Sequence, residues 1–404
     1  MYATEIESLT PIVSRVLNIE DITSGDPKKQ YLVRYRGQLN NTDTAAAYEQ
    51  LASALSPYEV TPLFRREKGR HVVLLMSGIL RPTPSKSWVN IVLFIATVLS
   101  VLIAGTIYTL GGIYEGPLNP TSVDLLPHVV ASLGGGLAFT VSLLAILLAH
   151  EFGHYLAGRY HRTHVTLPYF IPFPLSPFGT MGAFIQLKEP PKNKRILLDI
   201  GIAGPIAGLI VAIPVLILGL SLSQVSHIPA NLPPGQGLQI EGNSLIYLFT
   251  KFVVFGQLLP APSSFNGLSP LQYWVQYFFT GKPLPLGGMD VMLHPIAWAG
   301  WAGLLVTALN LIPAGQLDGG HIIYVLLGKR ATSLLPFILL ALVLLGFFWP
   351  GWWLWAFLIF LLGRFHAEPL DQITTLDPSR QALAVVGLLI FILVFTPVPL
   401  LAVG

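Results

Sequence analysis

Two different patterns of hydrophobic and polar residues divide the chain near residue 87. Before that point, KQYLVRYRGQL alternates as a strand does, DTAAAYEQLASAL has helical spacing, and YEVTPLFRREKGRHVVLLMSG predicts two strands around a charged turn. We therefore expect a small, soluble α/β domain over residues 1–86, followed by the linker RPTPSKS. Neither a phosphate-binding loop nor a cluster of metal ligands is found in the sequence of this domain.

Beyond residue 87, long apolar runs dominate the chain. Each run spans, or nearly spans, a hydrocarbon core of about 30 Å at a helical rise of about 1.5 Å per residue. The pattern predicts a polytopic α-helical membrane protein with about seven crossings and a transmembrane domain over residues 87–404. The predicted crossings are 88–112, 128–158, 196–221, 295–313, 332–349, 351–363 and 381–402.

Composition agrees with a membrane protein. Hydrophobic residues make up 53% of the chain and charged residues only 11%, against about 25% charged in soluble domains. The mean hydropathy is +0.64, which excludes a soluble domain with a large core. The absence of cysteine excludes disulfides and thiolate metal sites. The first residues, MYATEIESLT, are acidic and polar, so we expect neither a signal peptide nor a transit peptide there.

The basic residues predict the orientation. With a cytoplasmic N-terminus, 21 of the 23 Lys and Arg residues fall on the inside, and only Lys251 and Lys282 fall outside. We expect an integral protein of a bacterial plasma membrane. The apolar piece at 245–259 is short and contains Lys251, so we interpret it as interfacial or re-entrant. The sequence leaves the oligomeric state open.

The stretch LAHEFGHY places three ionisable residues near the end of a predicted crossing. His150 and His154 are four residues apart, so a helix brings both imidazoles to one face, and Glu151 lies beside the first of them. H-E-x-x-H binds zinc through its two histidines and uses the glutamate as a general base. The alternative is a hydrogen-bonded His/Glu cluster that ties helices together. Metal binding is favoured, because buried ionisable groups in a membrane need a functional reason.

A catalytic zinc needs a third protein ligand. Asp318, in NLIPAGQLDGGH, lies eleven residues before Lys329 and Arg330, a depth similar to that of His150. We favour Asp318 as this ligand over the alternative that it only caps the following helix. The nearby His161 and His164 fall in a basic loop, where we interpret them as surface residues.

The segment YFIPFPLSPFGTMGAFIQLKE, residues 169–189, is apolar but too rich in Pro and Gly for a helix. We predict a re-entrant hairpin. Its edge alternates like a strand and is expected to hold an unwound substrate by strand addition, through Gly182, Ala183, Phe184, Ile185 and Gln186. Asn310 is a candidate for hydrogen bonding to the substrate or the developing oxyanion, with helix capping or an interhelical contact as the alternative.

Three ordered motifs resemble the site-2 protease family of intramembrane zinc metalloproteases. HEFGH matches the first motif, GPIAG at 204–208 matches a glycine motif on the helix between, and NLIPAGQLDGG matches N-x-x-P-x-x-x-L-D-G-G at every fixed position. FGTMGAFIQL, DIGIAGPIAG and Gly315–Gln316 are similar to the branch without PDZ or CBS domains that includes the chloroplast and cyanobacterial-type homologues.

The resemblance implies a zinc metalloendopeptidase that holds one Zn²⁺ per chain through His150, His154 and Asp318, with Glu151 as the base. It implies cleavage of peptide bonds in or near the transmembrane segments of single-span membrane proteins, and no nucleic-acid partner. The alternative function is a membrane transporter or metal permease that uses the His/Asp cluster as a transit site. A catalytically idle scaffold is a third possibility.

Overall fold

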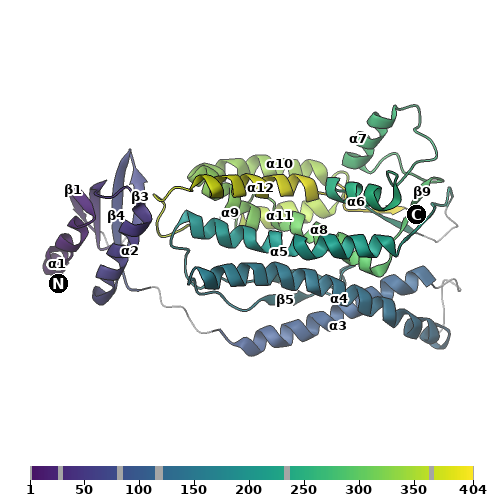
Figure 1. Cartoon of the computed structure of the whole chain (residues 1–404), viewed down its shortest axis with the longest axis horizontal. Helices are drawn as coiled ribbons and strands as arrows, with labels where there is room; N and C mark the ends of the chain where they lie inside the picture. The colour runs from purple at the N-terminus through teal and green to yellow at the C-terminus, as the bar shows by residue number, and fades with distance from the viewer. Residues whose placement is uncertain are drawn as a thin grey trace.

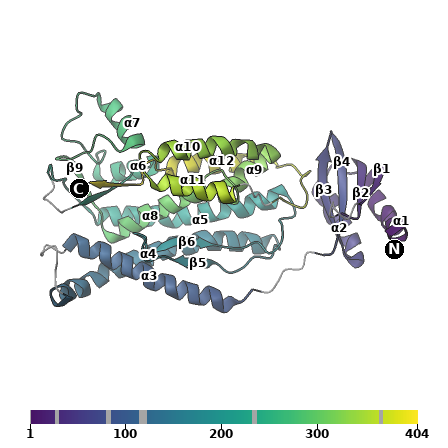
Figure 2. The ribbon, with the colours of Figure 1, turned by 180° about the vertical axis from the view of Figure 1, so that it is seen from behind.

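The computed structural model describes residues 2–25, 31–79, 85–113, 122–231, 237–363 and 368–403. A small sheet unit occupies one end, and long helices extend away from it as a bundle (Figure 1). The far end of the bundle carries short strands, two short helices and the C-terminus, as the reverse view also shows (Figure 2). Residues 81–84 of the predicted linker lie outside the described residues.

Residues 2–79, here called the N-terminal unit, contain an antiparallel sheet of strand order β1-β2-β4-β3. The predicted strand, helix and strand pair are confirmed as β2, α2 and the β3–β4 hairpin, whereas α1 and β1 were not predicted. A hydrophobic cluster of its own lies between helices and sheet. The elements are α1 (Tyr2–Ser14), β1 (Leu17–Ser24), β2 (Val33–Leu39), α2 (Thr44–Leu55), η2 (Ser56–Tyr58), β3 (Val60–Glu67) and β4 (Arg70–Ser77).

Three long helices form one side of the bundle: α3 (Ser87–Ile113), α4 (Ser122–Tyr160) and α5 (Lys194–Ser221). They match the first three predicted crossings. Among the described residues, four helical runs are long and apolar enough to cross a membrane: Ser87–Gly112, Leu125–Tyr160, Lys194–Ser221 and Asp318–Leu345. The chain is therefore a polytopic membrane protein. The fourth run overlaps the predicted crossing 332–349, and shorter apolar helices lie at the predicted crossings 351–363 and 381–402.

The other side of the bundle is built from α8 (Pro295–Asn310), α9 (Asp318–Leu327), η3 (Gly328–Leu334), α10 (Leu335–Leu345), α11 (Gly351–Leu362) and α12 (Pro378–Val394). The predicted crossing 295–313 was too long, because α8 ends at Asn310. Pro313 lacks a backbone N–H and Gly315 has a left-handed φ of 59°, so the chain turns there before α9 begins at Asp318. The predicted crossing 381–402 was also too long, since β10 (Leu400–Val403) follows α12.

The far end of the bundle is capped by two small sheets, in which β7 (Gln224–His227) pairs with β9 (Met289–Met292) and β8 (Leu238–Glu241) pairs with β10. Two short helices, α6 (Leu245–Phe255) and α7 (Pro270–Thr280), complete this cap. Lys251 on α6 is completely buried, with its Nζ 3.9 Å from Glu241 and 3.8 Å from Asp290. The segment 245–259 is thus a helix of only 11 residues followed by a turn at Gly256, and its one ammonium group lies inside the protein near two acids.

The predicted hairpin between α4 and α5 is present. Strands β5 (Tyr169–Pro172) and β6 (Thr180–Phe184) pair antiparallel. The chain that leaves β6 then pairs with the segment after α4: the Thr166 N–H donates to the Gln186 carbonyl at 3.1 Å, and the Lys188 N–H donates to the His164 carbonyl at 2.8 Å. This ladder fixes the path of residues 183–191, here called the rim segment because it lines both cavities at the site described next.

Candidate metal centre

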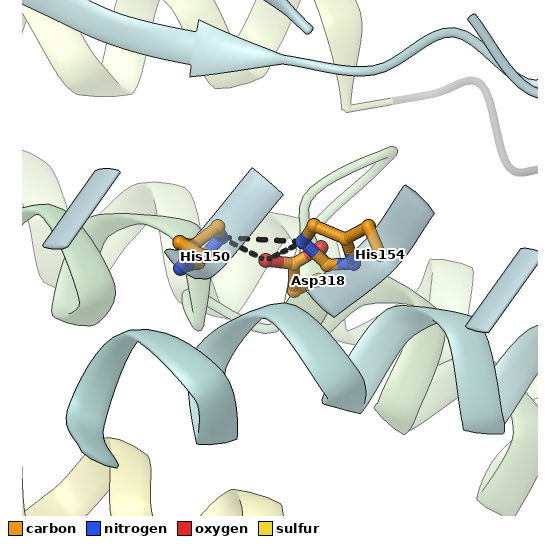
Figure 3. Close-up of side chains that lie close together, drawn as sticks. All are labelled: His150, His154 and Asp318. Carbon is orange, nitrogen blue, oxygen red and sulfur yellow. Dashed lines mark hydrogen bonds and ion pairs between the residues drawn. The ribbon is translucent and has the colours of Figure 1, made fainter. Parts of the chain in front are cut away.

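The first two candidate ligands lie on adjacent turns of α4, and the third begins α9 (Figure 3). The Nε2 atoms of His150 and His154 are 3.2 Å apart. The Asp318 Oδ2 lies 3.2 Å from the His150 Nε2 and 3.3 Å from the His154 Nε2. Both imidazoles are buried, with exposed fractions of 3% and 6%. The helix break at residues 311–317 brings Asp318 to α4, so it forms one compact triangle with two histidines that lie 168 and 164 positions before it in the chain.

The spacing of this triangle fits a tetrahedral metal ion. Ligand atoms that lie about 2.0 Å from zinc at tetrahedral angles are about 3.3 Å from one another. The three interatomic distances of 3.2, 3.2 and 3.3 Å match that edge length. Among the described residues, this is the group of His and acidic side chains whose ligand atoms converge closely enough to hold a metal.

The orientation of His154 is set by α5. Its Nδ1 lies 2.7 Å from the carbonyl oxygen of Ile200, and because a carbonyl can only accept, Nδ1 carries the proton and Nε2 presents its lone pair to the centre. Gly204 makes this close approach possible, since a Cβ there would lie 2.1 Å from the His154 Nε2. The glycine motif on α5 therefore provides space for the ligand.

Glu151 lines the same cavity as the three ligands. Its side chain is buried, and its Oε2 has no hydrogen-bond partner among the described residues. A buried carboxylate oxygen without a partner is costly unless a ligand or water occupies the space before it. The Ile185 backbone N–H donates to this carboxylate, so the unpartnered Oε2 is the atom available to exchange a proton with a group bound in the cavity.

Asn310, the last residue of α8, points at the same centre. Its Nδ2 lies 3.3 Å from the His150 Nε2, and the residue lines the cavity. Asn310 is therefore placed beside the site, as the sequence predicted, within reach of anything bound to His150.

The predicted substrate edge lies partly at the site. The cavity has a volume of about 160 Å³, and Ala183, Phe184 and Ile185 line it. Gly182 and Gln186 do not line this cavity. Gln186 instead faces a second cavity of about 600 Å³, which shares Phe184, Ile185, Leu187, Gln316 and His321 with the first. The two cavities thus meet along the rim segment.

The rejected histidine candidates lie elsewhere. His161 Nε2 pairs with Asp199 Oδ2 at 2.9 Å, and His164 Nδ1 pairs with Glu189 Oε1 at 2.9 Å. The His164 side chain is exposed, as predicted, but the His161 side chain is only 16% exposed and belongs to an ion-pair network. The interpretation of His161 as an ordinary surface residue was therefore wrong.

Sequence reasoning missed several residues around the centre. Ile200 and Gly201 of α5, and Gln316 and Leu317 of the helix break, also line the cavity. Ile200 orients His154 through its backbone carbonyl, so the type of its side chain gives no sequence signal of this role. Gln316 lies two residues before Asp318, so its position in the helix break was the one available signal.

Comparison with known proteins agrees with this geometry. The family model for peptidase family M50 matches residues 138–346, just over half of the chain, and includes all three candidate ligands. The chain belongs to peptidase family M50. The predicted resemblance to site-2 proteases is thereby confirmed.

Relatives of this M50 member come from chloroplasts. "Probable zinc metalloprotease EGY1, chloroplastic" of Arabidopsis thaliana is 29% identical over 342 residues, which cover 80% of this chain and 56% of the relative. "Probable zinc metalloprotease EGY2, chloroplastic" of Oryza sativa subsp. indica is 30% identical over 257 residues, covering 63% and 41%. The M50 chain thus spans about half the length of the curated relatives it matches. Their names lend no support to the bacterial plasma membrane predicted from the sequence. No solved structure matches the chain.

Proposed function

We propose that this M50 member is an intramembrane zinc metalloprotease that hydrolyses peptide bonds in or near transmembrane segments of membrane proteins. The observation that carries this proposal is the triangle of His150, His154 and Asp318 beside the buried Glu151. The two histidines and Glu151 lie on α4, which is long and apolar enough to cross a membrane. Family membership favours a peptidase over the transporter or permease alternative.

His150, His154 and Asp318 would hold one Zn²⁺ through Nε2, Nε2 and Oδ2. When bound, zinc supplies Lewis-acid chemistry, which polarises a carbonyl and lowers the pKa of a coordinated water. Glu151 accepts the proton of the attacking water and returns it to the leaving amine. Asn310 lies beside His150, where its side-chain N–H can donate to the substrate or to the negative charge that develops on its carbonyl oxygen.

The rim segment is proposed to bind the substrate. A transmembrane helix hides its carbonyls in hydrogen bonds, so the scissile bond becomes accessible only after local unwinding. Gly182, Ala183, Phe184, Ile185 and Gln186 form the hairpin edge at which an unwound strand would be added. The Gln186 N–H already donates to Thr166 Oγ1 at 3.0 Å. Because successive N–H groups of a strand point in opposite directions, the donors of the neighbouring residues are directed away from residue 166.

For topology, we propose seven crossings and a cytoplasmic N-terminus, with residues 1–86 as a soluble domain and 87–404 as the protease domain. The support is the distribution of basic residues and the helix bounds above. Single-span proteins are the proposed substrates.

Substrates can be found by comparing membrane fragments of cells that carry wild-type protein or Glu151→Gln in place of the chromosomal copy. Single-span proteins should accumulate uncut in the variant, while zinc content and protein level stay unchanged, because Glu151 is not among the proposed ligands. Identical fragment patterns in the two strains would contradict the proposed function.

A further inference from the structure

The N-terminal unit is joined to the rest of the chain by backbone hydrogen bonds. The exposed edge of β3 pairs with the segment before α12: the Phe64 N–H donates to the Leu370 carbonyl at 3.0 Å, and the Gln372 N–H donates to the Phe64 carbonyl at 3.0 Å. The bridge between Phe64 and Asp371 is parallel. A single parallel bridge therefore joins the sheet of the N-terminal unit to a segment more than 300 positions away.

The same segment pairs on its other side with the end of the rim segment. The Leu370 N–H donates to the Pro191 carbonyl at 3.0 Å, and the Asp371 N–H donates to the Lys192 carbonyl at 2.7 Å. A second parallel bridge joins Asn193 to Asp371. Two isolated parallel bridges thus connect β3, through Asp371, to the chain that directly follows the rim segment.

Side chains strengthen this joint at several points. The Arg65 Nη1 donates to the carbonyls of Leu370 at 2.7 Å and Pro369 at 3.2 Å. Its Nη2 lies 3.9 Å from Glu368, a residue that lines the larger cavity. The Glu49 carboxylate pairs with the Lys192 ammonium at 2.8 Å. The Arg65 guanidinium of the N-terminal unit is therefore bound to the segment that contributes Glu368 to the wall of the larger cavity.

Apolar side chains also pack between the N-terminal unit and the segment before α12. Leu370 and Ile373 pack against the hydrophobic cluster of the N-terminal unit. Phe64, which forms the bridge to Asp371, is completely buried. The Arg65 side chain is only 17% exposed. These buried side chains indicate that the N-terminal unit is packed against the rest of the protein and not only connected to it through the chain.

We propose that the N-terminal unit is a positioning element for the protease site, in which Arg65 holds the rim segment in register with the metal centre. The proposal rests on the proposed function. Because rim residues 184–191 line the larger cavity and residue 191 is hydrogen-bonded to the joint, displacement of the N-terminal unit shifts the edge that receives the substrate. Ångström-scale misplacement of a substrate-positioning group can reduce a rate by about 10²-fold.

The variant Arg65→Ala tests this role, with Arg66→Ala as the matched control, since Arg66 is the exposed neighbour on the same strand. Arg65→Ala should lower kcat/KM for a membrane substrate about tenfold, mainly through KM, with zinc content unchanged. Arg65→Lys, which keeps the charge but not the guanidinium fork, should have an intermediate effect. Arg66→Ala should behave as wild type.

A covalent tether separates undocking from a general folding defect. The chain has no cysteine, so Glu49→Cys with Lys192→Cys can be joined selectively by a short bismaleimide. The tether should restore cleavage in the Arg65→Ala background. It should also restore slow hydrogen exchange at the amides of residues 185–189, 192 and 193, which Arg65→Ala is expected to accelerate. Normal cleavage by untethered Arg65→Ala, or a defect that the tether does not restore, would overturn the positioning role.

The same experiment distinguishes this proposal from the proposed function. If wild type cleaves no faster than Glu151→Gln, then the protease assignment fails. The exchange measurement needs no protease activity, so it still tests whether Arg65 holds the rim segment: unchanged exchange in Arg65→Ala would overturn the positioning role in that case too.

Discussion

Arg380 and Asp199 form a two-point ion pair that links α12 to α5. The Arg380 Nε donates to Oδ1 at 2.9 Å, and its Nη2 donates to Oδ2 at 2.6 Å. Asp199 directly precedes Ile200, whose carbonyl orients His154. The pair therefore fixes the part of α5 that holds a candidate ligand in its required tautomer.

Asp199→Asn should weaken zinc binding. The substitution removes the charge that holds Arg380 and pairs with His161, so the backbone at residue 200 gains freedom. Loss of an outer partner of a metal site typically costs about 10- to 100-fold in affinity, and we expect the lower value, measured by competition with a chelator. Asp377→Asn, which removes the other partner of Arg380, serves as the control and should retain most of the affinity. Equal zinc affinity in wild type and Asp199→Asn would contradict this account.

Asp318→Ala should remove most of the bound zinc, measured by elemental analysis of purified protein. The substitution deletes one corner of the ligand triangle, and the two remaining imidazoles make a much weaker site. His164→Ala, at an exposed residue paired with Glu189, should keep one zinc per chain. Full zinc in Asp318→Ala, together with loss in His161→Ala or His164→Ala, would mean that the third ligand is misassigned.

The buried Glu241 predicts a pH dependence of stability. Burial, together with the nearby Asp290, raises the pKa of Glu241 to about 7. Because this pKa is above its unfolded value, the contribution to folding is fully present below the unfolded value and is lost as pH rises through about 7. Thermal stability in detergent should therefore fall between pH 5 and pH 8.

Glu241→Gln isolates this effect, since the amide does not titrate and can still accept from the Tyr247 hydroxyl. Its stability should depend less on pH than that of wild type over the same range. Glu20→Gln, at an exposed acid of the N-terminal unit, should retain the wild-type dependence. The same pH slope in wild type and Glu241→Gln would exclude Glu241 as the source.

Proline substitutions test strand addition at the rim. Phe184→Pro and Ile185→Pro each remove one backbone donor, and both must be made singly because successive donors point in opposite directions. The Ile185 N–H also donates to the Glu151 carboxylate, so a loss of activity in Ile185→Pro includes the loss of this contact to the general base. At least one should cut proteolysis strongly while zinc stays bound. Phe184→Ala and Ile185→Ala, which keep the backbone donors, should be much less impaired. Normal cleavage by both proline variants would exclude strand addition here.

The sequence predicts those parts of the molecule that depend on local spacing. The four-residue spacing of His150 and His154 predicts that they share one helix face, and the first three crossings follow from long apolar runs. The β3–β4 hairpin follows from alternation around the Lys68–Gly69 turn, where both residues have positive φ.

Features that depend on non-local contacts could not be predicted in this way. The pairing of β3 with residues 370–372 leaves no periodic signal in either segment, because it arises from backbone groups. The burial of Lys251 depends on two acids that come from separate strands of the cap. The start of α9 at Asp318 depends on how the turn after α8 packs. The sequence motif therefore identified Asp318 as a candidate ligand but did not give the bounds of the helix that begins there.

The central claim is that the His150–His154–Asp318 centre, with Glu151, hydrolyses peptide bonds within a membrane. The most direct measurement compares purified wild type and Glu151→Gln, both verified to carry one zinc per chain, in vesicles that contain a single-span membrane protein. Wild type should cleave it in or near the transmembrane segment, a chelator should stop the cleavage, and added zinc should restore it. Glu151→Gln should be slower by at least about 10²-fold, as expected for loss of a general base. Equal cleavage by both proteins, or cleavage that persists in the zinc-free enzyme, would contradict the account.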